Sequence, residues 1–170
     1  NSSWNRELEA LTVSTLLSKD GTESLRGFGL FHPGDQFLDF QFNVDSLEVG
    51  FLNPFLSKVV QNVKGTASGR MFFKGPISKP YLTGRVHLND GGFNVDMLQT
   101  AYSLADSVIF YPNEIRFKEM LVTDRNGRSG RFRGSIYHAG NFSEMIYNLR
   151  LDANNMLMLN TRMRDNPYYY

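Results

Sequence analysis

The sequence contains no cysteine among its 170 residues. This absence excludes disulfides, thiolate catalysis and cysteine zinc sites, although it leaves the redox compartment open. No apolar run approaches the roughly 18 to 20 residues that a membrane-spanning helix needs, and no basic leader precedes an apolar stretch. An excess of one charge is also missing, since 18 Lys and Arg residues balance 17 Asp and Glu residues. We therefore expect no nucleic-acid partner.

The two ends of the chain lack the marks of a complete product. It begins without Met and stops on Tyr168, Tyr169 and Tyr170, which fits a piece of a longer protein. We expect any membrane anchor or signal to lie outside this piece. A length of 170 residues is typical of one domain, so we expect a single β-rich domain over residues 1–170.

Helical periodicity is scarce, whereas aromatic residues make up 14% of the chain and phenylalanine leads them. This combination predicts β-sheet. The longest clean alternation runs from Gln36 to Val49, where apolar residues at 38, 40, 42 and 44 alternate with polar residues at 39, 41, 43 and 45. We expect an antiparallel strand there, with one dry face and one wet face.

The segment from Gly65 to Val95 organises the rest of the prediction, because it is typical of a β-meander of three strands and two turns. Pro76 and Pro80 bracket the first turn, where a residue without an N–H does least harm. Asp90-Gly91-Gly92 supplies residues that tolerate positive φ at the second turn. Between the turns, Leu82, Gly84, Val86 and Leu88 fall on one side of the strand, opposite Thr83, Arg85 and His87.

Further strands are expected on both sides of this segment. Their expected ranges are 24–31, 107–111, 114–118, 120–123, 130–138, 145–153 and 156–163, with a strand-like core at 11–15 and a frayed start at 1–5. Residues 96–106 leave a helical turn and an irregular strand both open. Hairpin turns are predicted at 19–22, at 32–35 and at Asn126-Gly127. About ten strands make the predicted fold all-β, an antiparallel meander.

One short helix is expected at residues 54–61. Asn53 is a favourable N-cap residue, and Pro54 is preferred in the first helical turn. Apolar residues at 55, 56, 59, 60 and 63 recur at helical spacing, and Gly65 follows where a helix stop is expected.

Residues that could perform catalysis are scattered. His32, His87 and His138 lie far apart and form no metal signature, so we interpret them as solvated or satisfied side chains. Asp124-Arg125-Asn126-Gly127 lacks the acidic spacing of a calcium loop and is interpreted as a turn. We expect no catalytic residue, no metal and no cofactor, and therefore no enzyme.

The densest basic run comprises Arg125, Arg128, Arg131 and Arg133. Strand parity points Phe132 away from Arg131 and Arg133, so the ring cannot stack beside them on a common nucleic-acid surface. A contact with anionic headgroups or nucleic acid is the weaker interpretation of this run, and a plain solvated face is the stronger one. The glycosylation triplets at Asn1 and Asn141, and the terminal tyrosines as an aromatic belt, carry little weight.

The distributed apolar side of the strands is the unusual feature of the sequence. A sheet with one apolar face must cover it with another sheet, with helices or with a ligand, and only one short helix is expected here. The pattern alone favours a β-sandwich over a ligand-holding groove.

A resemblance bears on this choice. The segment from Leu47 to Gly134 resembles the C-terminal domain of the translocation and assembly module subunit TamB, within the AsmA-like group. The matching features begin with the short apolar helix ending at Gly65 and the run GTASGRMFFKGPISKPYLTGRVHLNDGGF. They continue with the apolar pair Ile109 and Ile115, with Leu121-Val122-Thr123-Asp124, and with the strand that follows Asn126-Gly127. The similarity covers about half of the chain, and residues 1–46 do not align with the family pattern.

The resemblance implies a long, open, taco-like β-sheet around a hydrophobic groove in the periplasm of a Gram-negative bacterium. Proteins of this kind are anchored in the inner membrane and work with a barrel-type outer-membrane assembly factor. They are implicated in phospholipid transport or in β-barrel protein assembly. Phospholipid acyl chains are then the expected ligand. The rival interpretation is a protein-interaction module whose exposed strand edge pairs with outer-membrane β-barrel substrates or with the assembly factor.

Strand parity together with the resemblance predicts the residues that line the groove. These are Leu38, Phe40, Phe42, Leu82, Val86, Leu88, Phe117, Phe132 and Ile136. The residues expected to turn or bend the sheet are Gly65, Gly69, Gly75, Pro76, Pro80, Gly84, Gly91, Gly92, Asn126 and Gly127.

Overall fold

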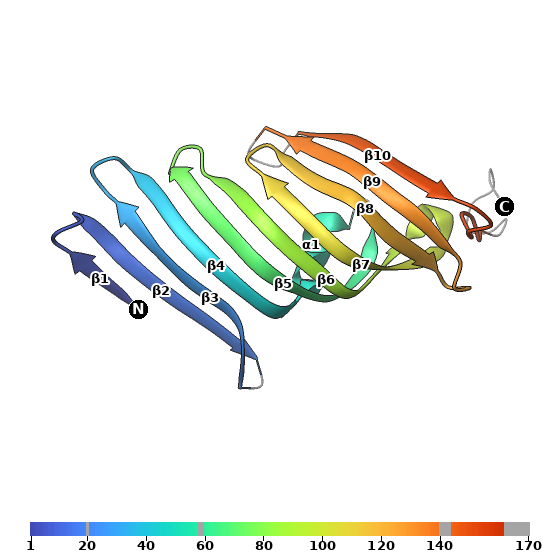
Figure 1. The fold of residues 1–170 in the computed structure, drawn as a ribbon, viewed down its shortest axis with the longest axis horizontal. Helices are drawn as coiled ribbons and strands as arrows, with labels where there is room; N and C mark the ends of the chain where they lie inside the picture. Colours follow the sequence, from blue (N-terminus) through green and yellow to red (C-terminus); the bar gives the residue numbers. More distant parts are fainter. Residues whose placement is uncertain (20, 58–59, 140–143, 162–170) are drawn as a thin grey trace.

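The computed structural model describes residues 1–19, 21–57, 60–139 and 144–161. Within these ranges ten antiparallel strands form one sheet in chain order, and the sheet does not close on itself (Figure 1). The strands are β1 (Ser2–Asn5), β2 (Ala10–Lys19), β3 (Thr22–His32), β4 (Phe37–Glu48), β5 (Gln61–Pro76), β6 (Tyr81–Val95), β7 (Thr100–Tyr111), β8 (Glu114–Asp124), β9 (Ser129–His138) and β10 (Met145–Ala153). The all-β meander is confirmed, whereas the two-sheet sandwich that the pattern favoured is not formed.

Several of the expected segments have different limits. Residues 1–5 are not frayed, because β1 pairs antiparallel with β2 from Ser2 opposite Val13 to Asn5 opposite Ala10. The strand expected at 107–111 begins at Thr100, directly after a short 3-10 turn, η2 (Asp96–Leu98). Two expected strands at 114–118 and 120–123 are one strand, β8, with a register shift between Phe117 and Met120.

The turn expected at Asp90-Gly91-Gly92 is wrong. Strand β6 continues through these residues to Val95, with a register shift between Leu88 and Gly91 against β7. Asp90 itself has a positive φ of 50°, which agrees with the expectation that residues 90–92 tolerate positive φ. The irregularity forms a β-bulge, which adds twist to a strand without reversing it.

The short helical segment lies earlier than the sequence predicted. It consists of a 3-10 turn, η1 (Val49–Leu52), followed by one helical turn, α1 (Asn53–Leu56). The N-cap of α1 is Leu52, so the prediction of Asn53 as the N-cap is wrong. The Asn53 side chain bonds elsewhere: its Nδ2 donates to the carbonyls of Gly50 and Val63, and its Oδ1 accepts from the Val63 N–H at 2.7 Å. Residues 58–59 of the expected helix lie outside the described residues. Strand β5 begins at Gln61, and Gly65 lies inside it rather than at a helix stop.

The strand expected at 156–163 is also wrong over its described part, since residues 156–161 are not in a strand. This segment is held by the β8–β9 hairpin and by β7. The buried Asp124 carboxylate accepts from the N–H groups of Asn126 and Arg128 and from Leu157 N–H at 2.6 Å. These hydrogen bonds hold the pKa of Asp124 below its usual value, and the bond from Leu157 has the largest effect. Tyr102 donates its hydroxyl to the Leu157 carbonyl at 2.9 Å.

The expected hairpin turns at 32–35 and at Asn126-Gly127 are confirmed, with Gly127 at a φ of 78° and its N–H donating to the Asp124 carbonyl. Asp20, within the turn expected at 19–22, the triplet at Asn141, and Tyr168 to Tyr170 lie outside the described residues. Among the residues that are described, no helix is long and apolar enough to cross a membrane.

Candidate functional site: the apolar face of the sheet

One face of the sheet gathers the large apolar side chains, and we call it the apolar face; the opposite side is the polar face. Residues paired across an antiparallel ladder share a face, so the register defines both. One row on the apolar face runs across six strands through Val44, Gly69, Val86, Val108, Phe117 and Gly134. The neighbouring row runs through Phe42, Met71, Gly84, Phe110, Ile115 and Ile136.

The nine residues predicted to line a groove all lie on this face. Phe42, Leu82, Val86, Leu88, Phe117 and Phe132 belong to one apolar cluster. Phe40 stacks on Phe42 with ring centroids 6.3 Å apart. Leu38 lies opposite Gly75, and Ile136 lies between Ile115 and Tyr147. The facing of these strands is therefore confirmed; that these residues line a lipid groove stays a prediction.

The apolar cluster has further members beyond the nine residues predicted to line the groove. They are Val49, Ala67, Met71, Val108, Met120, Val44, Leu52, Val63, Leu104, Phe110 and Ile115. Met71 alternates with polar Arg70 along β5, and this alternation could have predicted that Met71 lies on the apolar face. Val49 and Leu52 gave no such signal, because they lie outside the strands and reach the cluster only through the tertiary fold.

The apolar face is only partly covered. Of the nine predicted residues Val86 alone is buried, and the other eight keep partial exposure. In the described parts of the chain, two segments outside the strands join the apolar clusters. Val49 and Leu52 of η1 pack on the main cluster, and Met156 packs on a second cluster with Tyr102 and Val122. Figure 1 shows α1 behind the sheet, at the level of β5 to β7.

Glycines on the apolar face make room for the rings of the next strand. A Cβ atom on Gly29 would lie 2.5 Å from the ring of Phe40, and one on Gly27 would lie 2.8 Å from the ring of Phe42. The space beside the two glycines of β3 is therefore filled by the phenylalanines of β4.

The residues expected to bend the sheet lie inside strands, beside a turn and at a β-bulge. Gly65, Gly69, Gly75 and Gly84 have positive φ inside strands β5 and β6. Pro76 and Pro80 flank the turn between those strands, as expected. Gly91 and Gly92 are buried at the bulge of β6 and do not turn the chain.

The polar face carries ion pairs and hydrogen bonds between neighbouring strands. Lys74 and Asp39 lie 2.8 Å apart across β5 and β4. On β8, Arg116 contacts Glu114 at 2.8 Å, and Ser135 donates to the same carboxylate. The hydrogen bonds from Arg116 and Ser135 hold the pKa of Glu114 below its usual value, and the bond from Arg116 has the larger effect.

Each of the four arginines in the basic run at 125–133 has an ion-pair or hydrogen-bond partner. Arg131 pairs with Glu119 at 3.0 Å and Arg133 with Asp152 at 3.2 Å. Arg125 donates to the Asn160 side chain and Arg128 to the Asn155 carbonyl. Arg131 and Arg133 lie on the polar face, opposite Phe132, as parity predicted.

The histidines do not come together. His32 lies at the end of β3, His87 is exposed on the polar face, and His138 is buried at the end of β9. No group of three metal-ligating side chains occurs among the residues that the structure describes.

Together the fold and the site define an unclosed antiparallel β-meander with one partly covered apolar face. Comparison with protein-family models finds no match, and neither the curated proteins nor the solved structures contain a match to this chain.

Proposed function

We propose that the apolar face shields phospholipid acyl chains from water. The observation that carries the proposal is the partial exposure of the apolar rows: they cross six strands without interruption, yet only short segments of the described chain cover them. Each methylene removed from water contributes about 0.8 kcal/mol, so an uncovered apolar row favours an acyl chain as its cover.

In this proposal the chain acts passively, and no bond is made or broken. The sheet is bent around the acyl chains as a groove, and the chain is one segment of a periplasmic protein that bridges the inner and outer membranes of a Gram-negative bacterium. The resemblance of residues 47–134 to the TamB C-terminal domain supports this setting, and the partly covered apolar face supports the groove. An anchor outside this segment and a barrel-type assembly factor complete the proposed arrangement.

The test is photo-crosslinking in cells from positions on the two faces. A photoreactive amino acid replaces Phe42 or Leu82 on the apolar face, and Gln41 or Arg85 on the polar face serves as the matched control in the same strand. We expect mass spectrometry to find phospholipid attached at Phe42 and Leu82, which are both partly exposed. Crosslinks that form only from Gln41 or Arg85 would contradict the proposal.

A second candidate function rests on β10. Among the described strands β10 pairs with β9 alone, so its outer edge is open. Tyr147 and Leu149 on this edge strand are 52% and 41% exposed. Open edges with apolar side chains pair with added strands, and a strand of an outer-membrane barrel protein is the proposed partner.

Native mass spectrometry of the purified chain separates the two candidates. Co-purified phospholipid supports the acyl-chain function. A lipid-free chain that binds barrel-derived peptides, and loses them in Leu149→Pro, supports pairing at the β10 edge, because proline removes an N–H from the edge.

A further inference from the structure

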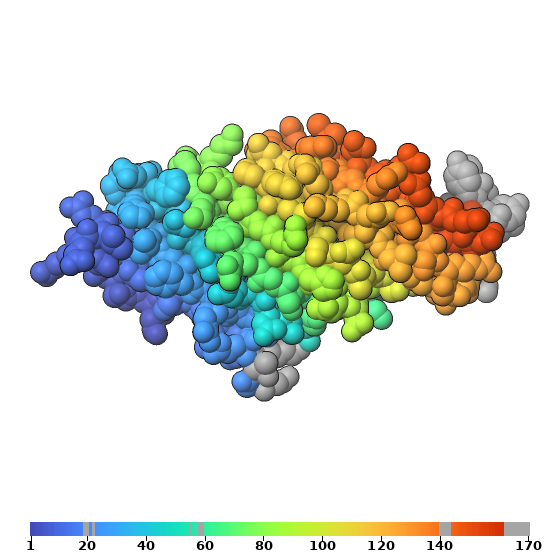
Figure 2. Space-filling view, viewed as in Figure 1, coloured from blue at the N-terminus to red at the C-terminus, as the bar shows by residue number. Residues whose placement is uncertain are grey.

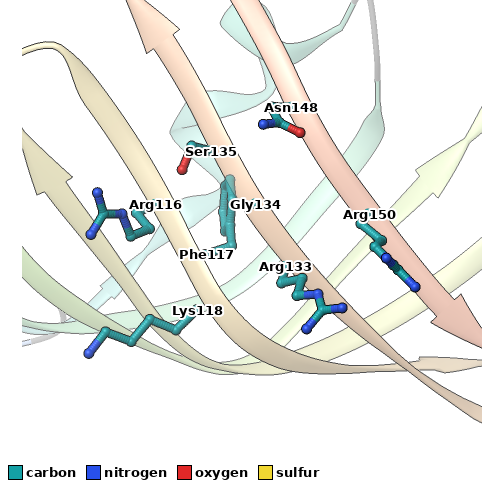
Figure 3. A pocket seen from close by; sticks show the side chains of 8 residues that line it. All are labelled: Arg116, Phe117, Lys118, Arg133, Gly134, Ser135, Asn148 and Arg150. Atoms are coloured by element: carbon teal, nitrogen blue, oxygen red, sulfur yellow. The ribbon is translucent and has the colours of Figure 1, made fainter.

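The polar face of β8, β9 and β10 carries a concentration of positive charge. Arg116, Lys118, Arg133 and Arg150 surround a shallow depression of about 490 Å³, whose lining also includes Ser135 and Asn148. Figure 3 shows Arg116 and Lys118 on one side of this depression and Arg133 and Arg150 on the other. The four cations come from three adjacent strands, so the fold rather than the sequence brings them together.

The acidic residues beside the depression do not balance these charges. Glu114 pairs with Arg116, while Arg133 and Arg150 share one carboxylate, that of Asp152, at 3.2 and 2.7 Å. Lys118 is exposed and has no ion pair in the part of the chain that the structure describes. Four cations therefore face two carboxylates, which leaves a surplus of positive charge on a surface whose chain as a whole is nearly neutral.

The same basic surface continues along the polar face. Arg70 of β5 lies directly opposite Arg85 of β6, and Arg85 is followed in register by Ile109 and then Arg116. Like charges directly opposite each other destabilise a sheet. Neither Arg70 nor Arg85 has an ion pair within the described residues, so an anion at this surface would offset their repulsion.

Exposed apolar and aromatic side chains lie next to the cations. Tyr111, Tyr137 and Ile146 occupy the next row of the polar face, around Glu114, and Ile146 is 72% exposed. The Arg116 guanidinium lies 4.7 Å from the centre of the Tyr111 ring. Seen from this side, the strands follow one another in chain order and no distant described segment lies over them (Figure 2).

From this arrangement we propose that the polar face of β8 to β10 docks on a bilayer that contains anionic phospholipid. The docking patch consists of Arg116, Lys118, Arg133, Arg150, Tyr111, Tyr137 and Ile146. Cations beside tyrosine and an aliphatic side chain match the phosphate layer and the adjoining acyl boundary of a bilayer. A nucleic acid would use the cations but would leave Ile146 in water. This contact is made by the face opposite the apolar rows, so it stands independently of the acyl-chain function.

The first test measures binding of the purified chain to vesicles by co-sedimentation. Vesicles of phosphatidylcholine alone are compared with vesicles that also contain phosphatidylglycerol. We expect binding to the anionic vesicles only, weakening as salt is added. Lys118→Gln should weaken this binding about fivefold. This factor corresponds to the roughly 1 kcal/mol that each basic side chain contributes near an anionic surface. Lys79→Gln is the matched control, since it removes the same charge in the exposed turn between β5 and β6.

The second test locates the contact on the sheet. The chain has no cysteine, so a single Ile146→Cys substitution provides one labelling site for an environment-sensitive dye. A separate variant, Phe28→Cys, is the control, because residue 28 is exposed on the polar face of β3. We expect a blue shift of the dye on anionic vesicles at position 146 and none at position 28.

Three results would overturn the docking proposal. They are equal binding of Lys118→Gln and the original chain, equal binding to neutral and anionic vesicles, and a dye at position 146 that does not respond. Competition of vesicle binding by an oligonucleotide that also depends on Lys118 would assign the patch to nucleic acid instead. Loss of phospholipid crosslinks at Phe42 leaves all of these measurements unaffected, so failure of the two proposals is distinguishable.

Discussion

At the scale of single residues, backbone conformation at Gly84 is set by the neighbouring strand. Its φ is 137°, and a Cβ atom there would lie 2.2 Å from the Arg70 carbonyl oxygen and 2.9 Å from the Met71 Cα. Only a residue without a side chain fits this approach of β6 to β5.

We therefore expect Gly84→Ala to lower the free energy of unfolding by about 2–4 kcal/mol, combining backbone strain with overpacking. Urea denaturation followed by circular dichroism measures the change. Gly34→Ala is the control, because a Cβ atom there meets nothing within 4 Å. Similar losses in both variants would show that the close approach at Gly84 is not what constrains the position.

His138 is a buried titratable side chain whose protonation bears on the stability of the fold. Burial lowers its pKa below the usual value, so the folded chain takes up this proton at a lower pH than the unfolded chain does. The contribution to stability is complete above about pH 6.5 and is lost as the pH falls from there through the folded pKa.

The free energy of unfolding should consequently decrease as the pH falls below about 6.5, and His138→Gln should flatten this part of the profile. Urea titrations at a series of pH values measure it. His87→Gln, which changes an exposed histidine, should leave the slope in place. An unchanged slope in His138→Gln would assign the pH dependence to other groups.

At the scale of elements, the connection between β4 and β5 is fastened by one side chain. Asn53 bonds both the N–H and the carbonyl of Val63, at 2.7 and 3.0 Å, and so ties α1 to the start of β5. This fastening keeps Val49 and Leu52 on the apolar cluster.

Asn53→Ala should lower the free energy of unfolding by about 1–3 kcal/mol, because the part-buried Val63 backbone groups lose their partners. It should also raise hydrogen exchange at Val63 and at the residues of η1. Ser57→Ala is a suitable control, since it removes an exposed hydroxyl that bonds only to the Pro54 carbonyl. Unchanged exchange at Val63 in Asn53→Ala would mean that packing alone holds the segment.

Sequence patterns predicted the elements best where alternation was long. The parity of β4, β6 and β9 and the bounds of β10 followed from the residues, because each apolar position repeats with the period of the strand. The prediction missed the limits of the helix expected at 54–61, and it was wrong in the described part, 156–161, of the last expected strand. The described residues there take their conformation from contacts with β5 and with Asp124, which local patterns do not encode.

At the scale of the whole molecule, each strand within the described residues pairs only with its neighbours in sequence. Stability in such an array is close to a sum over adjacent pairs, and the ends of the array have one neighbour fewer. The larger buried apolar cluster lies mostly in the middle, on β5 to β8, where it includes Met71, Val86, Val108 and Met120. Short β1 and exposed β10 mark the two ends.

Amide hydrogen exchange should therefore be slowest in β5 to β8 and fastest in β1, β2 and β10. Mass spectrometry of peptic fragments would resolve these regions. Uniform protection from β1 to β10 would contradict this graded stability and indicate a single cooperative unit.

The sequence by itself determined that the chain forms an antiparallel sheet and which side chains share each face, because a period of two assigns alternate residues to opposite faces. Only the tertiary structure decided that one unclosed sheet forms instead of two packed sheets, and that η1 and Met156 cover parts of the apolar face. It also brought Arg116, Lys118, Arg133 and Arg150 around one depression. The physical reason is the same in each case: these arrangements depend on contacts between residues far apart in the chain, and alternation within a strand carries no information about them.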